Sequence, residues 1–272
     1  MGLVDELIFG GIQLMFFKMK NNKRAKTFEA FAGEHQLSFA AKPSQYNGEI
    51  MQMQAPSSAE LKSKGQRRLS MKARTASRWF GDSPFQTKLW AFVSNRMRGD
   101  WQTNCNIMEG TWKGHLMTSF DTLWFDLGGV VIGDGDNTQE GEYTSVFAHC
   151  KATVPQVIIT PTGLLSALKR TDEGQMLNRG YHRLKFESTD FNKALRVSAV
   201  DERLAYDFIS QDMMEYLMEH KGEKWHIELS AGGVLISTVY TLKPAKVELA
   251  MDFLAGFLEH IDADLLQPAA TA

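Results

Sequence analysis

The sequence contains few of the residues that mark a secreted or metal-binding protein. Two of its 272 residues are cysteine, Cys105 and Cys150, and no CxxC pair or histidine cluster gives them metal-ligand spacing. We therefore expect two reduced thiols in preference to a disulfide. A cleavable signal peptide is not indicated, because Asp5 and Glu6 stand where positive charge is needed and no A-x-A site follows. We place the folded body in a cytosol-like compartment.

Neither sign of charge dominates the chain. It has 30 basic and 32 acidic residues, a formal net charge of −2, which argues against a general nucleic-acid binder. The apolar content of 43% is ordinary for a globular protein. The length allows one large domain or two modest ones.

Catalytic and metal-binding signatures are also missing. The seven histidines form no HxH or HExxH pair, and the chain has no Walker A or GxSxG motif. The acidic loop from Gly133 faintly resembles a calcium loop, but counting from Asp134 the sixth and twelfth positions hold Gln139 and Ser145 where glycine and glutamate are required. We therefore predict no catalytic, cofactor or metal residues and a protein that is not an enzyme.

The most informative feature present is an apolar stretch at the N-terminus that runs into a basic cluster. Residues 3–17 place apolar side chains at helical spacing, and from Leu7 to Phe17 only Gln13 is strongly polar. The apolar run is too short to span a bilayer, which needs roughly 20 residues. We expect an amphipathic helix whose membrane or partner contacts are Leu3, Val4, Leu7, Ile8, Ile12, Met15, Phe16, Phe17, Lys18, Lys20, Lys23 and Arg24.

Three arrangements of this helix fit the pattern. It could lie in a membrane interface, with the following lysines on anionic headgroups. It could dock in a groove of a partner protein. It could instead pack on its own domain.

The remaining chain divides by composition. We expect a helix and strand joining the body over 27–53, a basic solvated loop over 54–78, the body over 79–266 and a frayed tail over 267–272, after the N-terminal segment 1–26. The loop contains Arg67-Arg68-Leu69-Ser70, which resembles a basophilic kinase site but is better explained as solvated charge.

The body has the pattern of antiparallel strands followed by helices. Five tryptophans at 79, 90, 101, 112 and 124 predict a meander in which each strand supplies one ring, with turns at 98–100 and 109–110. Further strands are expected over 111–125, 143–152, 157–160, 183–187 and 194–200, and a hairpin through Gly232-Gly233. Helices are expected over 23–36, 163–170 and 245–261, and over 201–219 with a break near Ser210. These elements predict an α+β fold: a curved antiparallel sheet or partial barrel, one form being pleckstrin-homology-like, covered by the C-terminal helix.

About half of the chain resembles a known family. The segments are NIMEGTWKG at 106–114 leading to FD at 120–121, FES at 186–188 with FNK at 191–193, and DERLAY at 201–206 with MMEYL at 213–217. Together they are similar to the DUF3137-like family of uncharacterised bacterial proteins. The resemblance implies no activity or catalytic residue. It implies a membrane location, because members often carry transmembrane segments, whereas this chain has only the short apolar N-terminus.

These patterns favour a non-enzymatic, membrane-peripheral accessory or scaffold protein, a subunit associated with a membrane protein complex on the cytoplasmic side. The alternative is a cytoplasmic ligand- or partner-binding domain whose first helix packs internally. Deleting residues 1–20 separates the two hypotheses, because the deletion should release the first kind of protein from membranes and destabilise the second.

Overall fold

The computed structural model describes residues 3–42, 45–46, 101–126, 139–150, 156–162, 180–230 and 232–261. Its strands are β1 (Ser38–Ala40), β2 (Trp101–Trp112), β3 (His115–Asp126), β4 (Gln139–His149), β5 (Val157–Pro161), β6 (His182–Leu184), β7 (Leu195–Ala199), β8 (His226–Ser230) and β9 (Gly233–Ser237). Its helices are α1 (Leu3–Glu34), α7 (Thr189–Ala194), α8 (Glu202–Phe208), α9 (Gln211–Glu219) and α10 (Pro244–Glu259), with a 3₁₀ turn η4 (Lys221–Glu223).

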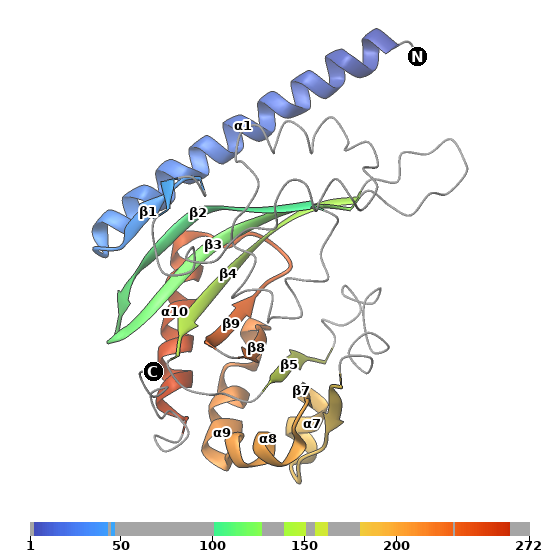
Figure 1. Ribbon diagram of the computed structural model, residues 1–272, viewed down its shortest axis with the longest axis vertical. Coiled ribbons are helices and arrows are strands. Elements are labelled where there is room, and N and C mark those ends of the chain that lie inside the picture. The colour runs from blue at the N-terminus through green and yellow to red at the C-terminus, as the bar shows by residue number, and fades with distance from the viewer. Residues whose placement is uncertain are drawn as a thin grey trace, which may run out of the picture. The chain divides into compact units, whose positions relative to one another are not determined.

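The strands form one antiparallel sheet in the order β1-β2-β3-β4-β9-β8-β5-β7-β6 (Figure 1). This confirms the predicted α+β class with a curved antiparallel sheet and a C-terminal helix. The order of the described strands is linear, with β1 and β6 at the two edges, so the sheet is open. The predicted loop over 54–78, helix over 163–170 and tail over 267–272 lie outside the described residues.

The chain divides into two compact units, which are considered separately. Unit 1 comprises residues 1–90, 98–110 and 119–143, and unit 2 comprises 91–97, 111–118 and 144–272. The long strands β2, β3 and β4 supply residues to both units.

In unit 1 the two predicted N-terminal helices are one continuous helix, α1, of 32 residues. The segment between them has no glycine or proline to interrupt it, and Asn21 within it is buried. Phe28 and Phe31 are buried. The helix ends with Gln36 at φ 56° while the Leu37 amide donates to the Ala32 carbonyl at 2.8 Å, the hydrogen bond of a Schellman motif.

The edge strand β1 explains why the predicted turn at 109–110 is wrong. Ser38 pairs with Glu109, so both residues of the expected turn lie inside β2. Gly110 leaves room there for Leu37, since a Cβ atom would lie 2.7 Å from Leu37 Cδ2. The chain turns instead at Lys113 and Gly114, with φ of 46° and 84°, as a two-residue hairpin needs. Trp101 and Trp112 therefore belong to one strand, and the expected meander with one tryptophan per strand is wrong.

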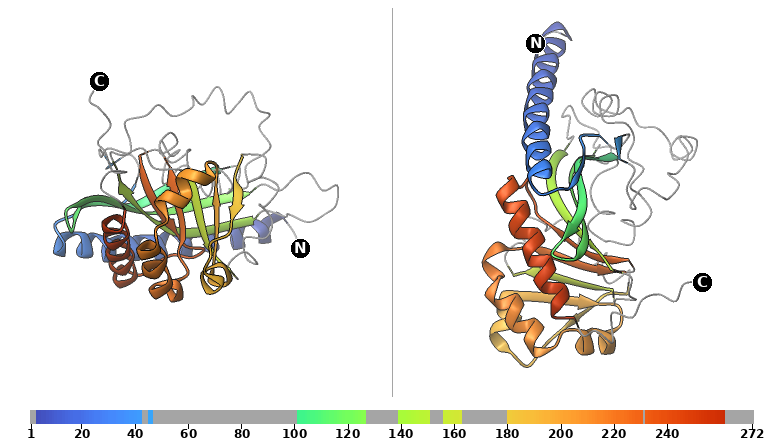
Figure 2. Two further views of the ribbon diagram at one scale, coloured as in Figure 1. Left: turned by 90° about the horizontal axis from the view of Figure 1, so that it is seen from below. Right: turned by 90° about the vertical axis from the view of Figure 1, so that its left-hand side faces the viewer.

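In unit 2 the strands predicted over 157–160 and 194–200 and the helix caps are confirmed. The strand predicted over 183–187 is shorter, and the single strand predicted over 111–125 is wrong, because the turn at Lys113 and Gly114 divides it between β2 and β3. The Asp201 and Ser210 side chains accept hydrogen bonds from the amides of Leu204 and Met213, so they cap α8 and α9. The β8–β9 hairpin turns at Gly232-Gly233, and Pro244 occupies the first turn of α10. Within this unit, α8, α9 and α10 lie on one side of β7, β8 and β9 (Figure 2).

Strand alternation gives this part of the sheet two different faces. One face, called here the apolar face, is made of aliphatic residues and lies under α10, since the Trp225 ring beside β8 lies 6.4 Å from the Phe253 ring of α10. Its members include Val146, Val234, Ile236, Ile227, Leu229, Val157, Ile159, Val197 and Ala199, all buried. Burial of these side chains is the main source of stability for unit 2.

A polar clasp joins the β2–β3 turn to α10 within unit 2. Trp112 Nε1 and Lys113 Nζ donate to Asp252 Oδ1 at 2.8 and 2.9 Å. Burial alone would raise the pKa of Asp252, but the hydrogen bonds from Lys113 and Trp112 and the lysine charge lower it below its usual value.

The lowered pKa makes the clasp sensitive to acid. A depressed carboxyl pKa stabilises the fold above the unfolded-state pKa of about 3.9, and the contribution is lost as the pH falls through the folded-state pKa. Asp252→Asn should therefore lower the melting temperature at pH 7, and the difference from the parent should shrink at about pH 3. Exposed Asp207→Asn is the matched control. An equal difference at both pH values would contradict the clasp.

Close packing at the start of β9 gives a second test. A Cβ atom at Gly233 would lie 2.1 Å from the Ala148 carbonyl oxygen and 2.6 Å from Phe147 Cζ. Gly233→Ala should therefore lower the free energy of unfolding by about 2 kcal/mol or more. Gly222→Ala, where nothing lies within 4 Å of the added atom, should change it by less than about 0.5 kcal/mol. Urea unfolding of both variants measures this, and equal stabilities would refute the register of β4 and β9.

Candidate functional site

A buried ion pair in unit 1 fixes the C-terminal half of α1. Arg24 Nε and Nη2 donate to Asp121 Oδ2 and Oδ1 at 2.6 and 2.7 Å, a two-pronged arrangement that a guanidinium and a carboxylate match. Asn106 Nδ2 also donates to Asp121 Oδ2, at 2.8 Å. Asn106 reaches it from a left-handed backbone position in β2, with φ of 50°.

The pair lies almost out of solvent. The Arg24 and Asp121 side chains are 13% and 2% exposed, and the guanidinium lies 4.3 Å from the centre of the Phe28 ring. A charge at this depth is stable only with its partner and hydrogen bonds in place. The pair therefore fixes where α1 sits in unit 1.

The structure assigns different environments to the basic residues predicted to meet a membrane or partner. Arg24 is not a surface charge, because it forms a buried ion pair with Asp121 inside unit 1. Lys20 pairs with Glu142 at 2.9 Å and remains 60% exposed, and Lys23 is exposed. Arg24 is therefore a structural residue, while Lys20 and Lys23 stay available to an outside surface.

The apolar residues predicted to make the contact, Leu3 to Phe17, lie in the N-terminal half of α1. Figure 1 shows this end of α1 running away from β1. Their side chains, and that of Lys18, are outside the described residues, so contact with a membrane or partner stays a prediction. No helix in the described ranges combines the length and apolar character needed to cross a membrane.

Neither cysteine is activated. Cys105 in unit 1 and Cys150 in unit 2 are free. Burial, then the charges of Asp121 and Glu142, raise the pKa of Cys105 well above its usual value, and burial raises that of Cys150 to about 11. Both are therefore thiols at neutral pH, poorly suited to act as nucleophiles or metal ligands.

The opposite face of the unit 2 sheet carries polar residues that the sequence analysis did not single out. Ser145 of β4 pairs with Ser237 of β9, which pairs with His226 of β8, and Thr160 of β5 pairs with Arg196 of β7. Thr160 Oγ1 lies 3.1 Å from His226 Nδ1, which joins the two sets. We call these five residues the polar row; they cross five strands on one face.

A buried carboxylate completes the polar row. His226 Nε2 lies 2.6 Å from Oε1 of Glu228, two residues along β8 and on the same face. Since a carboxylate only accepts, Nε2 donates, and in the neutral imidazole Nδ1 accepts from the Thr160 hydroxyl. His226 and Glu228 are 7% and 2% exposed.

The order hydroxyl, imidazole and carboxylate resembles a nucleophilic relay. Acyl transfer also needs donors aimed at a developing oxyanion. Thr160 lies within β5, which pairs with β7 on one side and β8 on the other, so its neighbouring amides serve the sheet. The chemistry that this arrangement supports best is hydrogen bonding to a polar group.

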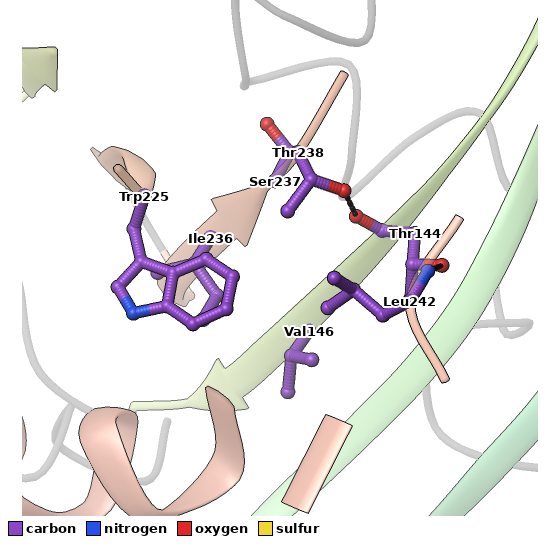
Figure 3. Close-up of a pocket in the computed structure, with 7 residues that line it drawn as sticks. All are labelled: Thr144, Val146, Trp225, Ile236, Ser237, Thr238 and Leu242. Carbon is purple, nitrogen blue, oxygen red and sulfur yellow. Dashed lines mark hydrogen bonds between the residues drawn. The ribbon is translucent and has the colours of Figure 1, made fainter. Parts of the chain in front are cut away.

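Other features of the described residues do not form a site. A shallow hollow lies between Trp225, Ile236 and Leu242 (Figure 3). Its threonines are already bonded, Thr238 Oγ1 to the Thr144 carbonyl and Thr144 Oγ1 to the Leu242 amide, and it is too tight for a water molecule. No cluster of three metal-ligating side chains occurs among the described residues.

The comparisons with known proteins support the fold. No family model and no curated protein matches the chain. The structure is similar to a crystal structure of the mycobacterial trehalose monomycolate transport factor A, TtfA, with a TM-score of 0.50. The likeness covers 91% of this chain and 98% of that chain at 12% sequence identity, so it shows a shared fold.

Breaking the buried ion pair tests its role. Arg24→Met should lower the free energy of unfolding by about 3 kcal/mol, because it strands the Asp121 carboxylate. Adding Asp121→Asn removes that charge and keeps an acceptor for Asn106, so the double variant should be more stable than Arg24→Met. Exposed Lys23→Met is the control, with a change below about 0.5 kcal/mol. Additive losses in chemical unfolding would contradict a coupled pair.

Proposed function

We propose that this chain is a non-enzymatic, membrane-peripheral accessory protein of a transport-related membrane complex, with the N-terminal half of α1 as its contact segment. The observation that carries the proposal is the difference between the two halves of α1. Its C-terminal half is fixed to unit 1 through Arg24, Phe28 and Phe31. Its N-terminal half carries the apolar run predicted to dock.

Because α1 is one continuous helix, it can act as a rigid spacer between unit 1 and the contact. At 1.5 Å per residue, 32 residues make a rod about 48 Å long. A rigid helix that is fixed at one end holds its other end at a defined distance, whereas a flexible linker does not. Met19, just before the fixed half, is 57% exposed, and Lys20 and Lys23 follow it at the surface. An apolar side chain beside basic residues is typical of a helix at an anionic membrane surface.

The shared fold with TtfA favours a transport-associated role over an enzymatic one. That protein is named as a transport factor, and the likeness extends over nearly all of both chains. The cytoplasmic side of the membrane and membership of the DUF3137-like family belong to the same proposal. The second candidate is a ligand- or partner-binding domain with α1 packed internally, which the buried positions of Phe28, Phe31 and Ala32 favour for the C-terminal half of the helix.

Charge reversal on the apolar run tests the contact segment. Ile8→Glu with Ile12→Glu should abolish flotation of the full chain with vesicles containing anionic lipid, because burying carboxylates in the interface is unfavourable. The melting temperature should not change, since the fixed half of α1 is intact. Glu29→Gln, exposed on the fixed half, is the matched control and should float like the parent.

Two outcomes would refute the contact segment as a membrane contact. One is flotation of the Ile8→Glu, Ile12→Glu variant equal to that of the parent. The other is a parent that does not float while the variant unfolds at lower temperature, which would establish the internally packed helix of the second candidate.

A further inference from the structure

The loop between β9 and α10, residues 238–243, exposes two adjacent apolar side chains. Val239 is 37% exposed and Tyr240 is 57% exposed. In the described part of unit 2, the other large apolar side chains at the surface are Val200 and Tyr206, which are 40% and 43% exposed. Exposed apolar residues are ordinary on a protein surface, so the surroundings of each pair decide whether it has a use.

The backbone of this loop is held by Thr144 of β4, within the same unit. The Thr144 amide donates to the Tyr240 carbonyl at 3.2 Å, and the Thr238 amide donates to the Thr144 carbonyl at 3.2 Å. The Leu242 amide donates to Thr144 Oγ1 at 2.8 Å. Because these hydrogen bonds fix the chain on both sides of Tyr240, the loop presents its exposed side chains without a further cost of ordering the backbone.

The charge beside Val239 and Tyr240 is positive. Residues 232–246 contain two exposed lysines, Lys243 and Lys246, and no acidic residue. Lys246 forms an ion pair with Glu223 at 2.7 Å. The charge nearest to Tyr240 along the chain is therefore the ammonium group of Lys243, which favours an anionic surface as the partner of this loop.

Val200 and Tyr206 lie in the opposite setting. Residues 201–207 contain three exposed acidic residues and one exposed arginine. The Tyr206 hydroxyl donates to the Lys185 carbonyl at 3.1 Å, and its ring lies 5.1 Å from the ring of Phe186. Tyr206 therefore serves the fold of unit 2, and its acidic neighbours would repel an anionic surface.

We propose that Val239 and Tyr240 form a second membrane contact, which binds an anionic lipid surface. The contact goes beyond the proposed function because it does not involve α1, and it rests on that function for the presence of a membrane. A tyrosine combines an apolar ring with a polar hydroxyl, which suits the boundary between headgroups and acyl chains. Lys243 adds attraction to the anionic headgroups.

The variant Val239→Ser with Tyr240→Ser removes the apolar groups and keeps Lys243. Binding of the full chain to vesicles containing phosphatidylglycerol should weaken about fivefold, because less apolar surface enters the interface. The melting temperature should not change, since both side chains are exposed. The matched control is Val200→Ser with Tyr206→Ser, which removes the same residue types at similar exposure and should bind like the parent.

Two further variants change the contact in other ways. Tyr240→Trp should strengthen binding about twofold, because the larger indole ring buries more apolar surface at the interface, and a loss of folding cannot produce this gain. Lys243→Gln should weaken binding to the anionic vesicles about twofold and leave binding to neutral phosphatidylcholine vesicles unchanged.

The α1 variant Ile8→Glu with Ile12→Glu, measured beside these, separates the two proposals. Equal binding by the parent and the Val239→Ser, Tyr240→Ser variant would overturn the loop contact, and so would an equal loss in the control. If the α1 variant binds like the parent while the loop variant is weakened, the proposed function is wrong and the loop contact stands. A parent that binds no vesicles would overturn both, as expected if the loop contacts a protein.

Discussion

The position of α1 depends on one buried contact, the guanidinium of Arg24 on the carboxylate of Asp121. The two charges stabilise each other only in one geometry, and Asn106 and the Phe28 ring complete their surroundings. A shift of α1 along or around its axis would strand a carboxylate that is 2% exposed. The pair therefore fixes the position of the C-terminal half of α1 within unit 1.

The second constraint is strand alternation in unit 2. One face of β4, β5, β7, β8 and β9 is aliphatic and lies under α10, which leaves every second residue to the other face. Those residues include the polar row and Glu228, brought together from five strands by the register of the sheet. The α10 side thus stabilises the unit, while the polar side holds the hydrogen-bonded pair His226 and Glu228 with Thr160.

The sequence alone was informative where the signal was local. The α+β class, the caps at Asp201 and Ser210 and the Gly232-Gly233 hairpin all follow from residues within a few positions of each other. The turn at 109–110 failed because Gly110 makes room for Leu37, a residue more than seventy positions away. The chain turns instead at Lys113-Gly114, and lysine before the glycine is not one of the residues that usually signal a two-residue hairpin turn.

The site was the least predictable part for the same reason. Sequence alone groups Arg24 with the surface lysines, because its partner Asp121 lies 97 positions away in the chain. The residues of the polar row are separated by up to 92 positions, from Ser145 to Ser237, and each resembles an outward-facing strand residue in the sequence. Only the register brings Ser237, His226 and Thr160 into one row. A hydroxyl pattern in alternate strand positions was the available signal, but solvation explains that pattern equally well.

The most direct test of the account is hydrogen exchange along α1 with and without vesicles containing anionic lipid. The account predicts that the amides of residues 3–17 exchange quickly in the absence of vesicles and become protected when vesicles are added. Those of residues 24–34 should be protected in both conditions, because Arg24, Phe28 and Phe31 fix that half to unit 1. Protection of both halves before vesicles are added, or no change in residues 3–17 on adding them, would contradict it.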